Sequence, residues 1–209
     1  MIKAILLDVY GTLLTTDLEI APYSDLLRAY QLDDRELEEA RRDFMTTPYD
    51  TIDAWVLALS RQYPDRVVSK EILHKVETEL KRHQASFRLF DGAAAVLDGL
   101  RGKGYVTAIV TNLSTTYKEP ILRLGLDELV DYRVYSCDVG FMKPEREIFE
   151  IALGAVEAAA GEAVMVGDNL ADDVEGAKNA GIRPIHIEAG VHGALPSLLE
   201  LPEHLERLI

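Results

Sequence analysis

Short apolar runs recur along the chain, and helical patterns separate them. Four of these runs lack the alternation of half-exposed strands: residues 3–7, 105–110, 163–166 and 183–187. Unbroken apolar runs of this length are typical of strands buried on both faces of a parallel sheet. A weaker run at 132–136 predicts a further strand. The helical patterns between the later strands cover residues 91–104, 146–161 and 171–181. This alternation predicts an α/β fold with a doubly wound parallel sheet.

Residues 17–86 do not follow that alternation, because they consist of four successive helical patterns. The last of these begins after Ser69, which is placed to cap the helix N-terminus. We expect residues 1–16 and 87–209 to form the α/β core, and residues 17–86 to form an inserted all-helical cap. Since the insertion follows the first strand directly, the cap should lie over the carboxyl end of that strand.

The composition favours a globular protein with an acidic surface. The 209 residues include 22 Lys and Arg against 36 Asp and Glu, which gives a formal net charge of -14. Such a surface repels nucleic acid and anionic lipid, so we expect neither as a partner. A small anionic substrate would then need local cations or a metal in its site.

The chain has one cysteine, Cys137, so an internal disulfide is impossible. A chain without disulfides fits a reducing compartment, and we expect a cytoplasmic protein. The first apolar run begins too early to leave room for a signal peptide. No apolar run approaches the roughly 18 residues of a membrane span.

Polar side chains stand at the ends of three predicted strands. They are Asp8, then Thr111 and Asn112, then Asp168 and Asn169. Ligands of open parallel sheets bind beyond the carboxyl ends of the strands, so these are candidate site residues. Two carboxylates at one edge repel each other unless a proton or a cation lies between them. Mg²⁺ combines carboxylates with water and phosphate oxygens, and the sequence therefore predicts a magnesium site at this edge.

Two further segments carry candidate chemistry. Lys143 comes directly before a proline at the start of a helical pattern, where its charge could face an anion. The acidic run 167–173 follows a strand and opens a helix, whose N-terminus either Asp172 or Asp173 can cap. The pattern leaves open which of these two acids supports the site.

Four short motifs, in order, resemble those of the haloacid dehalogenase-like hydrolase superfamily. They are DVYGT (8–12), VTN (110–112), KP (143–144) and GDNLADD (167–173). Each motif is weakly specific alone, but their order and the helical insertion after the first one cover nearly the whole chain. The resemblance implies a Rossmann-like core with a helical cap.

The resemblance also implies a mechanism in which Asp8 is the nucleophile and forms a covalent aspartyl intermediate that water then hydrolyses. In the phosphatase members, Mg²⁺ is held by two aspartates and a backbone carbonyl. By position these ligands would be Asp8, the carbonyl of Tyr10 and Asp168.

Other site residues follow from the same resemblance. Thr12, Thr111 and Asn112 would form the substrate-binding group, with Thr12 also orienting its loop. Lys143 would be a catalytic cation that offsets the negative charge of the transferring group.

Tyr10 departs from the phosphatase pattern, because phosphatases of this superfamily usually carry a second Asp there as general acid and base. The 2-haloacid dehalogenases place a tyrosine or another non-acid at this position. Arg41 or Arg42 falls near the cap arginine that those enzymes use for halide and carboxylate binding, although a charge-rich helix more often presents such residues to solvent.

The second half of the chain favours the phosphatases instead. Asp168 stands where those dehalogenases have Ser, Leu170 where they have Asn, and Phe149 where they have Tyr. We therefore expect Mg²⁺-dependent hydrolysis of a small phosphorylated metabolite. The alternatives are a 2-haloacid dehalogenase and a non-catalytic binding or regulatory protein of the same superfamily. The sequence specifies neither the substrate nor the oligomeric state.

Overall fold

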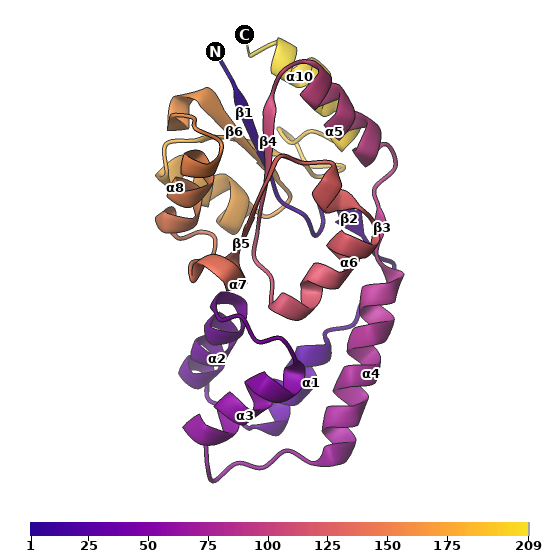
Figure 1. Ribbon diagram of the computed structural model, residues 1–209, viewed down its shortest axis with the longest axis vertical. Coiled ribbons are helices and arrows are strands. Elements are labelled where there is room, and N and C mark those ends of the chain that lie inside the picture. The colour runs from indigo at the N-terminus through magenta and orange to yellow at the C-terminus, as the bar shows by residue number, and fades with distance from the viewer. Residues whose placement is uncertain (209) are drawn as a thin grey trace.

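The computed structural model describes residues 1–208 and has a parallel sheet at its centre (Figure 1). The sheet strands are β1 (Ala4–Leu7), β4 (Val106–Thr111), β5 (Tyr132–Tyr135), β6 (Ala163–Gly167) and β7 (Arg183–His186). Their order is β5-β4-β1-β6-β7, and every neighbouring pair is parallel. The five predicted strands and the doubly wound α/β fold are confirmed.

β1 lies in the middle of this sheet and is buried on both faces. Ile5 and Leu7 pack on one side with α5 (Ala93–Gly102) and α10 (Leu201–Glu206). Ala4 and Leu6 point to the other side, where α8 (Arg146–Ala155) and α9 (Gly176–Asn179) cover the sheet. An apolar residue at every position is what two covered faces require.

Two predicted helices differ from the structure at their ends. The pattern at 146–161 predicts one long helix, but α8 ends at Ala155, and Glu157 then adopts a left-handed φ of 51° that turns the chain. The pattern at 171–181 begins as a π-helical turn, η4 (Leu170–Glu175), before α9. The remaining short core helices are α6 (Lys118–Arg123), α7 (Ser136–Val139), η1 (Thr115–Tyr117), η2 (Leu126–Glu128), η3 (Ala160–Glu162) and η5 (Leu198–Glu200).

Four helices lie beyond one end of the sheet (Figure 1). They are α1 (Pro22–Ala29), α2 (Asp34–Thr46), α3 (Ile52–Gln62) and α4 (Lys70–Ser86). The Ser69 hydroxyl accepts a hydrogen bond from the Ile72 amide at 3.3 Å, which is the predicted N-cap. No helix within residues 1–208 is both long and apolar enough to cross a membrane.

The four helices enclose an apolar cluster of their own, separate from the two clusters that flank the sheet. At its centre the rings of Phe44 and Trp55 stack with centroids 3.9 Å apart. The chain enters and leaves this unit through a short antiparallel pair, β2 (Leu14–Thr15) and β3 (Arg88–Leu89). On this basis we propose residues 17–86 as a cap domain, and residues 1–16 and 87–209 as the core domain, of which residue 209 lies outside the residues that the structure describes.

Candidate active site

The carboxyl ends of β1, β4 and β6 converge on one small cavity of about 150 Å³. The parallel pairing of β1 with both neighbours sets Asp8, Thr111 and Asp168 side by side at this edge. Six of the predicted site residues line the cavity: Asp8, Tyr10, Thr111, Asn112, Lys143 and Asp168. Asn169, Asp172 and Asp173 complete its wall.

Lys143 is the cation of the site, and its side chain is only 2% exposed. Its Nζ lies 2.6 Å from Asp8 Oδ1 and 2.5 Å from Asp173 Oδ1. Burial alone would lower the pKa of Lys143, but the charges of Asp8 and Asp173 outweigh it and raise that pKa above its ordinary value. Lys143 is therefore a fixed positive charge beside the proposed nucleophile.

Asn112 holds the backbone of Lys143 from both sides. Its Oδ1 accepts a hydrogen bond from the Lys143 amide at 2.7 Å, and its Nδ2 donates to the Lys143 carbonyl at 2.8 Å. A second, longer bond runs from Nδ2 to Asp172 Oδ2 at 3.4 Å. The side-chain amide of Asn112 thus fixes the backbone of Lys143, and its contact with substrate stays a prediction.

The sequence left open whether Asp172 or Asp173 supports the site, and in the structure Asp173 is the one that pairs with Lys143. Its side chain is 1% exposed, its Oδ1 pairs with Lys143, and its Oδ2 accepts a hydrogen bond from the Asn169 amide at 3.0 Å. Burial raises the pKa of Asp173 to about 6 despite the neighbouring ammonium. A Cβ at Gly167 would come within 2.2 Å of Asp173 Oδ2, so the glycine at the end of β6 makes room for this carboxylate.

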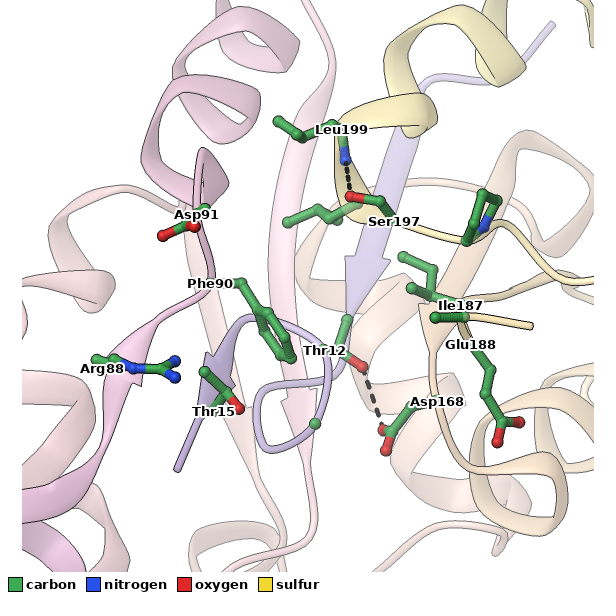
Figure 2. A pocket seen from close by; sticks show the side chains of 14 residues that line it. Thr12, Thr15, Arg88, Phe90, Asp91, Asp168, Ile187, Glu188, Ser197 and Leu199 are labelled. Atoms are coloured by element: carbon green, nitrogen blue, oxygen red, sulfur yellow. Dashed lines mark hydrogen bonds between the residues drawn. The ribbon is translucent and has the colours of Figure 1, made fainter. Parts of the chain in front are cut away.

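Asp168 lies at the wall between two cavities. Thr12 Oγ1 donates to its Oδ1 at 3.2 Å, as Figure 2 shows, and the pKa of Asp168 is raised by burial and by the charge of Asp8. The second cavity, of about 720 Å³, includes Thr12 but not Asp8. Gly11 has a φ of 94°, and a Cβ there would lie 2.1 Å from Asp168 Oδ2. Thr12 therefore orients the loop through Asp168, and its predicted contact with substrate is untested.

The Tyr10 side chain is engaged away from the carboxylates. Its hydroxyl donates to the Tyr117 carbonyl, and its ring packs edge-on against Phe87 at a centroid distance of 4.8 Å. Burial raises the pKa of Tyr10 above its ordinary value. The phenol therefore stays protonated, and its hydroxyl donates its hydrogen bond to a backbone carbonyl rather than to a group of the carboxylate cluster.

The donor set fits a hard divalent cation. Asp8, Asp168 and Asp173 each offer a carboxylate oxygen, and these oxygens lie within 4.8 Å of one another. Lys143 supplies a single positive charge against these three carboxylates, with Asp172 also on the cavity wall. Oxygen donors with a surplus of negative charge are the environment in which Mg²⁺ binds. Tyr10 lines the same cavity, which is where its carbonyl is expected as a ligand.

Four residues that the sequence comparison with dehalogenases singled out do not line the cavity of the carboxylate cluster. Phe149 is fully buried in the core, and Leu170 is 57% exposed. Arg42 pairs with Glu145 at 2.5 Å and thereby joins α2 to the core, and Arg41 is exposed on the same helix. Both arginines border a cavity beneath the cap.

The model of the haloacid dehalogenase-like hydrolase family matches residues 2–181. The chain therefore belongs to this family, as the motifs predicted. A glyceraldehyde 3-phosphate phosphatase of Pyrococcus furiosus is 37% identical over 119 residues, which are 56% of this chain and 49% of the relative. The chain thus spans about half the length of such curated relatives.

Solved structures match over the whole chain. A HAD phosphatase from Thermococcus onnurineus is 27% identical with a TM-score of 0.64, and the match covers 98% of both chains. A 2-haloacid dehalogenase from Pseudomonas syringae pv. Tomato DC3000 is 24% identical with a TM-score of 0.67, and the match covers 100% of both. At that identity the second likeness shows the fold alone.

Proposed function

We propose that the protein is a Mg²⁺-dependent phosphatase that uses Asp8 as nucleophile on a small phosphorylated metabolite. One observation carries the proposal: Asp168 stands with Asp8 and Asp173 in a carboxylate cluster that a single lysine cannot neutralise. Relatives named as phosphatases support it. The acidic surface and the single cysteine fit a cytoplasmic enzyme whose anionic substrate is bound by local charge.

The reaction would proceed through the side chains already described. Lys143 donates a hydrogen bond to Asp8 Oδ1, so Asp8 Oδ2 would attack phosphorus, and the bond from phosphorus to the leaving oxygen would break. The Thr111 hydroxyl would bind a phosphoryl oxygen, and the Lys143 charge would offset the negative charge that develops there. Bound Mg²⁺ would supply further charge neutralisation between the carboxylates and the phosphate. Water would then hydrolyse the phosphoaspartate and regenerate Asp8.

A 2-haloacid dehalogenase is the second candidate, and Tyr10 is the observation that favours it. Halide leaves without a proton, so the reaction needs no acid at position 10. Asp168 weighs against this candidate, because a metal-binding carboxylate beside the nucleophile has no part in displacing halide. A non-catalytic binding or regulatory protein is the third, since the site lacks a general acid.

Two assays on the purified protein separate these candidates. The first measures inorganic phosphate released from a panel of phosphate esters and acetyl phosphate, with Mg²⁺ and with EDTA. The second measures chloride released from 2-chloropropionate. We expect phosphate release that EDTA abolishes and no chloride release. Chloride release unaffected by EDTA would support the dehalogenase. Inactivity in both assays while Mg²⁺ is bound would support the non-catalytic binding or regulatory protein.

A further inference from the structure

A third cavity, here named the cap cavity, lies between the cap and the core and has a volume of about 440 Å³. Its walls come from α1, α2 and α3, with Tyr117 and Met142 added from the core. Much of the wall is aromatic or apolar, including Tyr23, Phe44 and Trp55. Cavities of this size and lining are typical of sites for small organic molecules.

No residue lines both this cavity and the catalytic one, but neighbouring residues of the chain line the two. Met142 borders it, and the next residue, Lys143, borders the catalytic cavity. A row of edge-on aromatic contacts also connects the two. Tyr23 lies 5.9 Å from Trp55 and 5.8 Å from Tyr117 between ring centroids, and Tyr117 lies 5.8 Å from Tyr10. A group leaving the phosphorus above Asp8 would therefore meet aromatic surface on the cap side.

The wall also includes Trp55, whose side chain is fully buried. Its indole N–H has no acceptor within residues 1–208 and almost no accessible surface, so it is not open to the cavity. The charged residues on the wall are Glu38, Arg41 and Arg42, and of these Arg42 pairs with Glu145.

The chemistry of the leaving group also favours an aromatic ring in the substrate. The Tyr10 hydroxyl is committed to the Tyr117 carbonyl, so no side chain at position 10 is free to protonate a departing oxygen. General acid catalysis is typically worth about 10² to 10⁴ in rate. A leaving group that departs as a stable anion avoids that loss, and a phenolate is such a group with an aromatic ring.

We propose that the cap cavity binds the aromatic ring of an aryl phosphate, whose phenolate is the leaving group. This proposal rests on the phosphatase function proposed above and names its substrate class. Asp8 would form a bond to phosphorus, and the bond from phosphorus to the aryl oxygen would break, with its electron pair leaving on the phenolate. Solvent then protonates the phenolate, and water releases inorganic phosphate from Asp8.

Binding can be tested without turnover, because Trp55 is the protein's single tryptophan. Its fluorescence reports directly on the cavity. We expect benzyl alcohol, a neutral probe, to change the emission saturably, and benzylphosphonate to bind more tightly than methylphosphonate. A linear, unsaturable response to benzyl alcohol and equal binding of the two phosphonates would overturn the proposal.

Steady-state kinetics test the cap cavity by comparing two substrates that both have good leaving groups, only one of which contains an aromatic ring. Phenyl phosphate has the ring and acetyl phosphate does not. Ser24 lines the cavity on α1, and Ser24→Phe should fill it. We expect the ratio of kcat/KM for phenyl phosphate over acetyl phosphate to fall by about tenfold to a hundredfold, the factor for losing burial of a ring-sized apolar group. Ser24→Leu is a milder filling variant should Ser24→Phe not fold.

Leu57→Phe on α3 is the matched control, because Leu57 is 53% exposed and lies outside the cavity. It should leave the ratio unchanged. An unchanged ratio in folded Ser24→Phe and Ser24→Leu would overturn the aryl assignment while acetyl phosphate turnover still supported a phosphatase. Saturable benzyl alcohol binding without hydrolysis of any phosphate would overturn the phosphatase proposal and, with it, the ring's role as leaving group.

Discussion

The catalytic cavity and the cap cavity are neighbours with opposite constructions. The catalytic cavity is small, its lining includes four aspartates and one lysine, and backbone amides hold the side chains of Asn112 and Asp173. The cap cavity is larger and largely apolar, and its walls are side chains from three helices. Charges need fixed partners, because each unpaired buried charge is costly, whereas apolar walls need only shape. The difference suggests that the reaction is set by the sheet edge and the choice of substrate by the cap.

Asp8→Asn should have the largest effect on activity. We expect turnover to fall by on the order of 10⁴-fold or more, because the amide cannot form the covalent intermediate. The fold should remain, since the Asn oxygen can still accept from Lys143 and the repulsion between Asp8 and Asp168 is removed. Phosphate release and thermal unfolding, with mass spectrometry to exclude deamidation, measure both. Substantial turnover by the intact amide would remove Asp8 as the nucleophile.

Lys143→Met should have the largest effect on stability. The substitution leaves the buried carboxylates of Asp8 and Asp173 without their cation, and breaking a buried ion pair in this way costs about 3 to 5 kcal/mol. Urea unfolding without Mg²⁺ measures the loss. Adding Asp173→Asn should recover part of it, because one uncompensated charge is then removed. A loss below about 1 kcal/mol, the range of surface ion pairs, would contradict the buried geometry.

Asp168→Ala should weaken Mg²⁺ binding in a calorimetric titration by about tenfold or more, since one of the carboxylate ligands is lost. Glu188→Gln is the control, because Glu188 lines the cavity of about 720 Å³ on the other side of Asp168 and not the catalytic cavity. Wild-type affinity should also fall as the pH drops through about 6, where Asp173 takes up its proton, because protonated carboxyls are poor ligands. Undiminished affinity in Asp168→Ala would remove the main support for phosphoryl chemistry.

Much of the sheet edge could be predicted from the sequence, because it depends on short-range patterns. Asp8 directly follows one apolar run, Asp168 follows another after a single glycine, and the carboxyl ends of parallel strands meet at the same edge. The choice between Asp172 and Asp173 could not be predicted, since the π-helical turn that directs Asp173 to Lys143 leaves no mark in an apolar pattern. The glycine at position 167, which makes room for Asp173, was the one available signal.

The cap cavity could not be predicted, because it depends on how separate helices pack. Trp55 and its apolar neighbours indicate a core in the sequence, and the structure does place Trp55 in one. That the same ring also borders a cavity depends on the distance between α1, α2 and α3, which no local pattern records. The orientation of Tyr10 away from the carboxylates likewise depends on contacts with Tyr117 and Phe87, far away in the sequence.

Tyr10→Phe should have the smallest effect, and it tests whether the Tyr10 hydroxyl acts as the general acid. If the Tyr10 hydroxyl were the general acid, its loss would cost about 10² to 10⁴ in turnover of alkyl phosphates. Because that hydroxyl donates to the Tyr117 carbonyl and its pKa is raised by burial, we expect turnover within about threefold of wild type, with stability lower by about 1 kcal/mol for the lost hydrogen bond.

Tyr10→Asp is the opposing variant, because it restores the acid usual in phosphatases of this family. It should raise turnover of alkyl phosphates relative to phenyl phosphate, although the contact with Phe87 is lost. A large loss of activity in Tyr10→Phe would instead identify the Tyr10 hydroxyl as the general acid. The expected preference for phenolate leaving groups would then have no chemical basis.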